Sequence, residues 1–251
     1  MATATEERQL DGDLLRLESV AKSFGRIRVA DNLNLTVRAG EAVGILGPNG
    51  AGKSTIFNLI TGHVRPDSGR IFYRGEDVTH LPPSARCRRG IGRSFQVPHP
   101  FVGMTVFENL LVGAVFGAGL TESAAAAHSH EILELTGLAK KANLLAGKLT
   151  LLDRKRLELA RAIATRPQLL LLDEIAGGLT DDEAHQLTET IMMLRKNGIS
   201  IVWIEHVVRA LMSVVDRLIV INSGAILKEG NPAAVMASHD VQSVYMGIEA
   251  A

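Results

Sequence analysis

The residues with the clearest chemistry form the segment GPNGAGKST at 47–55, which matches the pattern G-x-x-x-x-G-K-[ST]. Glycines at these spacings let backbone N–H groups turn inward around phosphate oxygens, and the N-terminus of a following helix adds a favourable dipole. Lys53 is expected to reach the β- and γ-phosphates of a nucleotide, and Ser54 to offer a hydroxyl to Mg²⁺. The residues predicted at the nucleotide are Gly47, Pro48, Asn49, Gly50, Ala51, Gly52, Lys53, Ser54 and Thr55.

Two carboxylates and a histidine end other apolar runs of the chain. LLLLDE at 169–174 ends on Asp173 and Glu174, and ISIVWIEH at 199–206 ends on His206. Because parallel strands of one sheet end at a common edge, we expect all three near the phosphate loop. Asp173 would then bind Mg²⁺, Glu174 would act on the attacking water as general base, and His206 would contact the γ-phosphate. Taken alone, such acids are more often a solvated strand end, and a lone histidine there is more often structural.

The hydrophobic pattern predicts the elements that must position these residues. Alternating residues at 14–20 and 32–40 predict antiparallel strands, whereas continuous runs such as AVGILG at 42–47 predict strands covered on both faces. A helix is expected at 53–62, and mostly helical structure from 105 to 166. After Pro167 strands and helices alternate again. We therefore predict an α/β fold, a P-loop NTPase core with an N-terminal antiparallel β subdomain and an inserted α-helical subdomain.

Composition narrows the possible functions of this chain. Among 251 residues, Lys+Arg and Asp+Glu number 27 each, and this balance argues against binding nucleic acid by bulk charge. The aromatic share of 4% disfavours stacking on RNA bases, and a single cysteine excludes a disulfide framework. No apolar run approaches the roughly 18 residues of a membrane span. These features predict a soluble, cytoplasmic protein.

The order of phosphate loop, acidic pair and strand-end histidine resembles the ATP-binding subunit of an ABC transporter. Gln96 in IGRSFQ is similar to the glutamine that touches Mg²⁺ and the attacking water in that family, next to the membrane subunit. Phe24 in AKSFG lies where the family stacks an aromatic ring on adenine. More narrowly, FQVPHPFVGMTVFENLL, RLELARA and AGGLT resemble the LivG group, which serves importers of branched-chain amino acids, amides, urea and aromatic acids.

The resemblance implies one ATP-binding domain at 13–251, a helical subdomain at about 97–165 and a flexible N-terminus at 1–12. It also implies ATP and Mg²⁺ as ligands, a second ATPase subunit, two integral membrane permease subunits and, indirectly, a substrate-binding protein. No nucleic-acid partner is expected. The chain would lie on the cytoplasmic face of the inner or plasma membrane.

One motif departs from the family pattern. The family signature Leu-Ser-Gly-Gly-Gln reads Leu-Thr-Leu-Leu-Asp here, at 149–153. Thr150 keeps a hydroxyl that could reach nucleotide, Leu152 replaces a glycine, and Asp153 would either cap its own helix or repel phosphate. The motif is therefore either a tolerated variant or a weakened site. After Glu174, Ile175 replaces the usual proline, and the turn 177–180 lacks the family's aspartate.

The altered signature favours a heterodimer. In this family each ATP lies between one subunit's phosphate loop and the other subunit's signature, so a homodimer would carry the altered signature at both sites. A LivF-like partner would leave this chain's Glu174 facing an intact signature. The alternative is a nucleotide-binding switch with weak hydrolysis. A P-loop kinase or GTPase is a further possibility, although no guanine-reading N-K-x-D motif is present.

Two further groups of charged or titratable residues need an interpretation. Arg86, Arg88, Arg89 and Arg93 form either a solvated helix face or a contact with a membrane subunit or anionic lipid. His128 and His130, in an alanine-rich helix, are expected to be solvated.

Overall fold

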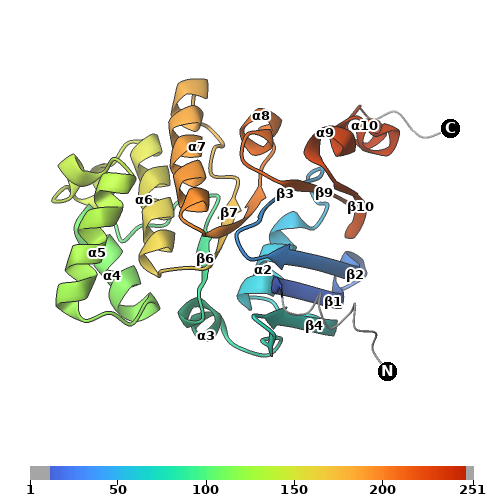
Figure 1. The fold of residues 1–251 in the computed structure, drawn as a ribbon, viewed down its shortest axis with the longest axis horizontal. Helices are drawn as coiled ribbons and strands as arrows, with labels where there is room; N and C mark the ends of the chain where they lie inside the picture. Colours follow the sequence, from blue (N-terminus) through green and yellow to red (C-terminus); the bar gives the residue numbers. More distant parts are fainter. Residues whose placement is uncertain (1–11, 247–251) are drawn as a thin grey trace.

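The computed structural model describes residues 12–246 and contains two sheets of different type (Figure 1). The four-stranded sheet has the order β2-β1-β4-β5 and is antiparallel, whereas the six-stranded sheet has the order β10-β9-β3-β8-β7-β6 and is parallel except for β10. The first sheet comprises β1 (Asp13–Phe24), β2 (Ile27–Arg38), β4 (Ser68–Tyr73) and β5 (Glu76–Asp77). The second comprises β3 (Ala42–Leu46), β6 (Ile91–Ser94), β7 (Leu169–Asp173), β8 (Ser200–Ile204), β9 (Arg217–Asn222) and β10 (Ala225–Gly230).

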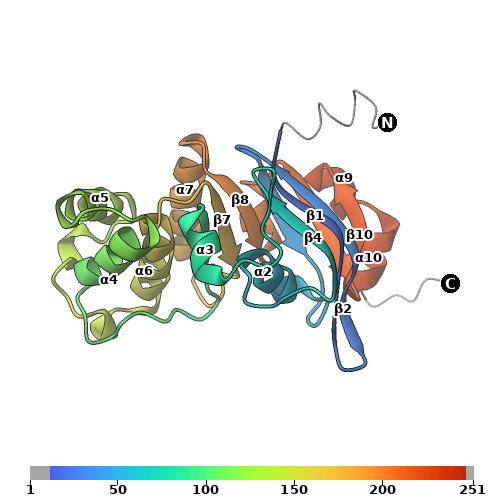
Figure 2. The same cartoon turned by 90° about the horizontal axis from the view of Figure 1, so that it is seen from below.

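The helices lie on both faces of the parallel sheet and at one end of the molecule (Figures 1 and 2). Two hydrophobic cores result. In the first, α2 packs between the two sheets. In the second, the other face of the parallel sheet packs against α7 and the helical subdomain. The α-helices are α2 (Lys53–Thr61), α3 (Pro83–Arg88), α4 (Val106–Val112), α5 (Glu122–Leu135), α6 (Leu151–Ala164), α7 (Asp181–Lys196), α8 (Val208–Met212), α9 (Pro232–Met236) and α10 (His239–Met246). A π-helical turn, Gly113–Gly117, follows α4.

Burial explains why these segments form strands of two kinds. All five residues of β3, β7 and β8 are buried, as continuous apolar runs require in a sheet covered on both faces. β1 alternates buried and partly exposed residues because only one of its faces meets the core. The predicted α/β fold with an antiparallel β subdomain and an inserted helical arm is confirmed.

The parallel register brings the predicted chemistry to one edge of the sheet. Ile45 pairs with Ile204, and Ile204 pairs with Asp173, so β3, β8 and β7 end at the same level. The segments that follow these strands begin with the phosphate loop, Glu205 and Glu174. Strand-end residues far apart in the sequence are therefore neighbours in space, as the sequence predicts.

The structure corrects one of the two histidine predictions and does not describe most of the N-terminus. His128 is not solvated: its side chain is 13% exposed, and burial and the charge of Arg166 lower its pKa, although Glu131 opposes this. His130 is exposed, as predicted, and packs on the Phe107 ring. The expectation for residues 1–12 falls outside the described residues except at Gly12. Among the helices of residues 12–246, none is long and apolar enough to cross a membrane.

The basic cluster also separates into two kinds of arginine. Arg86 is only 1% exposed and donates hydrogen bonds to the carbonyl oxygens of Leu59, Ile60 and Thr79, and burial lowers its pKa to about 10. Arg93 is an inward-facing partner of Asp173. A solvated face is therefore wrong for these two residues, and only Arg88 and Arg89 are exposed.

Candidate functional site

The phosphate loop connects the end of β3 to the first turn of α2. Gly52 has φ +102°, and a Cβ atom there would lie 2.2 Å from the carbonyl oxygen of Val29. At Gly47 a Cβ atom would lie 2.3 Å from the carbonyl oxygen of Ile221. No real side chain tolerates such contacts, so both positions require glycine. The first turn of α2 contains no acidic residue, which leaves its positive dipole end available to an anion.

Lys53 folds back over this loop. Its Nζ donates to the carbonyl oxygens of Gly47, at 2.7 Å, and Pro48, at 3.0 Å. Burial lowers the pKa of Lys53, while the nearby carboxylates of Glu174 and Asp173 oppose that shift. A cleft of about 360 Å³ lies beside it, and phosphate oxygens there would offer Lys53 stronger, charge-assisted partners than two carbonyls. The cleft is lined by Val29, Asn49, Gly50, Ala51, Gly52, Lys53, Ser54, Thr55, Gln96 and Glu174.

The Glu174 carboxylate belongs to a residue that lines this cleft. Its Oε2 accepts a hydrogen bond from Gln96 Nε2 at 2.5 Å and lies 3.7 Å from His206 Nδ1. The Glu174 backbone has φ +44°, an unusual value for a residue with a side chain, and its N–H donates to Ile204 at 2.8 Å. Strained backbone of this kind persists where surrounding contacts fix it, and it concentrates at functional sites. The structure thus brings the predicted residues Gln96, Glu174 and His206 together.

Two buried side chains that sequence reasoning missed support this strand end. Glu205 is 1% exposed, and its carboxylate accepts from the backbone N–H groups of Ala176, at 2.7 Å, and His206, at 3.1 Å. Lys155 of α6 donates to the carbonyl oxygens of Gln96, at 2.9 Å, and Glu174, at 3.3 Å. A carboxylate inside the otherwise apolar ISIVWIEH run was the available signal for Glu205; Lys155 lies in a basic stretch that gave no signal.

Asp173 is buried beside Arg93. Its Oδ2 accepts from Arg93 Nη2 at 2.8 Å, whereas its Oδ1 is buried without a hydrogen-bond partner. Such an orphaned oxygen fits a residue that completes its coordination with a cation. The described residues hold no group of three or more His, Cys, Asp or Glu side chains suited to a metal. Mg²⁺ that arrives with nucleotide phosphates and waters needs no such cage, so Asp173, Ser54 and Gln96 remain its predicted ligands.

Phe24 and Thr150, the remaining predicted residues, do not line this cleft. Phe24 ends β1 with its side chain 51% exposed, and Lys22 Nζ lies 5.5 Å from the ring centroid. Thr150 is the N-cap of α6: its Oγ1 accepts from Asp153 N–H at 3.3 Å and donates to Asp153 Oδ2 at 2.8 Å. The expectation that Asp153 itself caps the helix is therefore wrong.

The Asp153 carboxylate is neutralised inside the protein. Its side chain is 4% exposed, pairs with Lys141, and lies 3.8 Å from Arg156 Nη1. A paired and buried carboxylate repels phosphate less than a free one at a helix N-terminus would. Leu151, by contrast, is 50% exposed next to Thr150 and close to Gly178.

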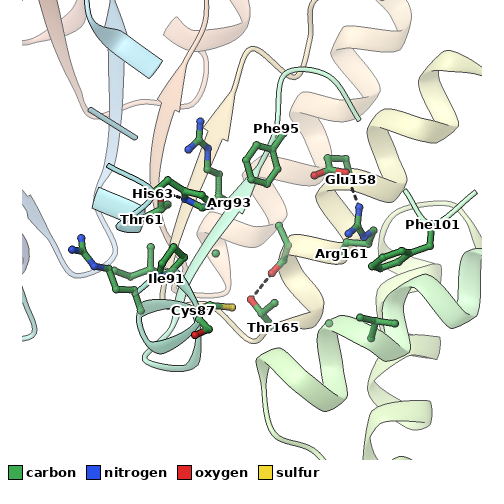
Figure 3. A pocket seen from close by; sticks show the side chains of 17 residues that line it. Thr61, His63, Cys87, Ile91, Arg93, Phe95, Phe101, Glu158, Arg161 and Thr165 are labelled. Atoms are coloured by element: carbon green, nitrogen blue, oxygen red, sulfur yellow. Dashed lines mark hydrogen bonds and ion pairs between the residues drawn. The ribbon is translucent and has the colours of Figure 1, made fainter. Parts of the chain in front are cut away.

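A second concavity, of about 350 Å³, separates the core from the helical subdomain (Figure 3). Phe95 and Phe101 flank it, and Glu158 and Arg161 form an ion pair of 3.1 Å within it. Burial raises the pKa of Glu158, and Arg161 opposes this. Arg93 of β6 and Phe95, directly after this strand, lie side by side (Figure 3). We name this concavity the β6–α6 groove.

Comparisons with known proteins agree with this geometry. The family model for the ABC transporter matches residues 30–177. The branched-chain amino acid transport ATP-binding protein LivG of Escherichia coli K12 is 37% identical over 93% of this chain and 98% of its own. The lipopolysaccharide export ATP-binding protein LptB of Haemophilus influenzae is 36% identical over 93% and 97%. The ADP conformation of MJ1267, an ATP-binding cassette of an ABC transporter, superposes with TM-score 0.85 and 31% identity over 94% and 99%.

The matches to LivG, LptB and MJ1267 span almost the entire chain, and the family model includes the phosphate loop, the acidic strand end and the inserted helices. The strands, loop and buried residues described above account for that similarity in physical terms. The chain therefore belongs to the ABC transporter family, as an ATPase subunit that hydrolyses ATP for transport.

Proposed function

We propose that this chain powers an importer of branched-chain amino acids or of related small polar compounds such as amides, urea and aromatic acids. Support comes from the LivG-like segments and from the 37% identity to LivG. LptB is similarly close at 36%, so the choice of cargo would come from the other chains of the transporter. The proposed location is the cytoplasmic face of the inner or plasma membrane.

ATP hydrolysis would use residues of the cleft and of its surroundings in distinct roles. The phosphate loop amides and Lys53 would hold the β- and γ-phosphates, and the Phe24 ring would stack on adenine. Glu174 would accept a proton from the attacking water, while His206 would contact the γ-phosphate. Bound Mg²⁺, held by Asp173, Ser54 and Gln96, would neutralise charge that develops on the phosphates. The contact of Gln96 and His206 with one Glu174 oxygen is the observation that carries this assignment.

ABC ATPases act as dimers and couple to membrane permease subunits. We propose that this chain pairs with a LivF-like subunit, with Thr150 and Leu151 facing the partner's phosphate loop. The position of Thr150 outside its own nucleotide cleft and the exposure of Leu151 support that surface. The β6–α6 groove, with Phe95 and Phe101 exposed and Gln96 directly after Phe95 in the chain, would receive a permease subunit. A substrate-binding protein would act through the permeases.

The substitution Glu174→Gln tests the catalytic assignment. It keeps the size of the side chain but removes the base, so we expect ATP to bind with its usual affinity while turnover falls by about 10²–10⁴-fold. Nucleotide affinity and steady-state phosphate release measure the two effects separately. Turnover close to that of the unchanged chain would remove Glu174 as the base.

The alternative, a nucleotide switch with weak hydrolysis, rests on the altered residues 149–153. Single-turnover hydrolysis with and without a LivF-like partner separates the two functions. Acceleration by the partner supports the heterodimer. Equally slow single turnover in both conditions supports the switch, and rapid cooperative hydrolysis by this chain alone contradicts both.

A further inference from the structure

Arg93 connects the wall of the β6–α6 groove to the acidic end of β7. It projects from β6, where its guanidinium carbon lies 4.8 Å from the Phe95 ring centroid and where it lines the β6–α6 groove beside that ring (Figure 3). Its guanidinium also reaches Asp173 at the end of the neighbouring strand β7. A single side chain thus touches both the wall of the groove and the carboxylate predicted to bind metal.

The arginine fixes one oxygen of that carboxylate and leaves the other free. Arg93 Nη2 donates to Asp173 Oδ2 at 2.8 Å, and Nη1 donates to Asn58 Oδ1 at 2.7 Å. Both charged side chains are buried, with 7% of Arg93 and 5% of Asp173 exposed. The planar guanidinium is therefore held at two points, and Asp173 Oδ1 remains buried without a partner.

We propose that Arg93 is a positioning residue that orients Asp173 toward the metal–nucleotide complex and links this orientation to the groove wall at Phe95. Partners behind a ligating carboxylate fix its direction, and their removal costs about 10–100-fold in metal affinity. The link follows from contact, because a displacement of Phe95 shifts the stacked guanidinium and the carboxylate that it holds. The proposal rests on the proposed function, which assigns Asp173 to the metal and the groove to a permease subunit.

Metal binding by the full chain tests the role of Arg93 without an activity assay. Mn²⁺ replaces Mg²⁺ as the probe, and electron paramagnetic resonance measures free Mn²⁺ in the presence of saturating ADP. Arg93→Met is expected to weaken Mn²⁺ binding by about 10–100-fold, while ADP affinity in EDTA stays as in the unchanged chain. Arg89→Met is the matched control, since it removes an exposed arginine–carboxylate pair of the same region and is expected to change neither affinity.

A second variant separates the loss of the positioning contact from the loss of a buried charge. Arg93→Met leaves Asp173 without compensation and can unfold the protein, whereas Arg93→Lys keeps the charge but cannot serve Asn58 and Asp173 with a planar fork. We expect Arg93→Lys to fold and to lose Mn²⁺ affinity in the same direction. Mn²⁺ affinity in Arg93→Lys equal to that of the unchanged chain overturns the proposal.

A double-mutant cycle tests the link to the groove. Phe95→Ala, which removes the ring beside the Arg93 guanidinium and substitutes no residue that lines the nucleotide cleft, is expected to weaken Mn²⁺ binding when Arg93 is present and to have no additional effect beside Arg93→Lys. Independent, additive effects, or no effect of Phe95→Ala, overturn the link. If the unchanged chain binds neither ADP nor ATP, with or without Mn²⁺, the proposed function itself fails, which is distinct from any outcome at Arg93.

Discussion

At the residue scale, the Glu174 carboxylate owes its position to groups that take no part in chemistry. Lys155 Nζ donates to the carbonyl oxygens of Glu174 and Gln96. The Glu205 carboxylate accepts a hydrogen bond from the backbone N–H of Ala176, two residues after Glu174. These bonds hold the backbone of Glu174 at φ +44°, which the isolated chain would seldom adopt. They also connect α6 of the helical subdomain to the core.

Lys155→Met should therefore impair turnover more than binding. The methionine fills a similar space but removes the donor that joins the carbonyl oxygens of Gln96 and Glu174, so the Glu174 backbone can relax. A misplacement of about 1 Å costs on the order of 10²-fold in rate, and we expect kcat to fall by about 10–100-fold while KM for ATP changes little. Steady-state kinetics measures both, and Lys148→Met, an exposed lysine before the same helix, is the control. A rise in KM at constant kcat would contradict this role.

At the element scale, the start of α6 shows how an altered motif still builds a stable helix. Thr150 caps the helix, Asp153 occupies the position that accepts its hydroxyl, and Lys141 closes the network. Thr105 of α4 and Thr180 of α7 cap their helices in a similar way, but there a glutamate takes the place of Asp153 and also accepts the backbone N–H of the threonine, which completes a capping box. Residues 149–153 therefore form a well-defined start of α6, independently of their effect on a partner's nucleotide.

Thr150→Ala is expected to lower the free energy of unfolding by about 1 kcal/mol, because one N-cap hydrogen bond is lost and Asp153 loses a donor. Chemical denaturation followed by circular dichroism measures the change. Thr150→Ser keeps the hydroxyl and should restore most of the stability. An equal loss of stability in the serine and alanine variants would show that the γ-methyl group, which both lack, matters and that the cap hydroxyl does not.

At the scale of the whole molecule, Arg217 joins the two sheets. From β9 it donates to the carboxylate of Glu41, at 2.7 Å, and to the carbonyl oxygen of Thr36 in β2. Burial alone would raise the pKa of Glu41, but the hydrogen bonds and charge of Arg217, with a smaller contribution from Arg38, lower it overall. Glu41 therefore stabilises the fold above its unfolded pKa near 4.5, and this contribution disappears as the pH falls through the lower folded value.

Arg217→Met is expected to cost about 1–3 kcal/mol at neutral pH, because a largely buried carboxylate loses its main partner. The cost should shrink in acid, since protonated Glu41 no longer needs the arginine. Unfolding free energies at pH 7 and pH 3.5 measure both parts. Arg28→Met, which removes an exposed pair with Asp31, should have little effect at either pH. A cost for Arg217→Met that grows in acid would reverse the assigned sign.

The sequence by itself determined the class of fold and the core of the site. Continuous apolar runs ended by Gly47, Asp173 and His206 are sufficient to predict parallel strands that share an edge, since strand burial and register follow from hydrophobic pattern. The glycines of the phosphate loop were equally readable, because close backbone approach excludes any side chain. Signals of this kind involve only a few consecutive residues, so they can be recognised in the sequence alone.

Only the tertiary structure decided which side chains pair across the core. Arg93 looked like one member of a basic surface, and His128 like a solvated histidine, because exposure depends on neighbours far away in the sequence. The partners of Arg93 lie 35 and 80 residues away, at Asn58 and Asp173. Likewise Lys155 meets Gln96 across 59 residues. Such contacts form because packing excludes water from charged groups, which must then find partners wherever the fold brings them.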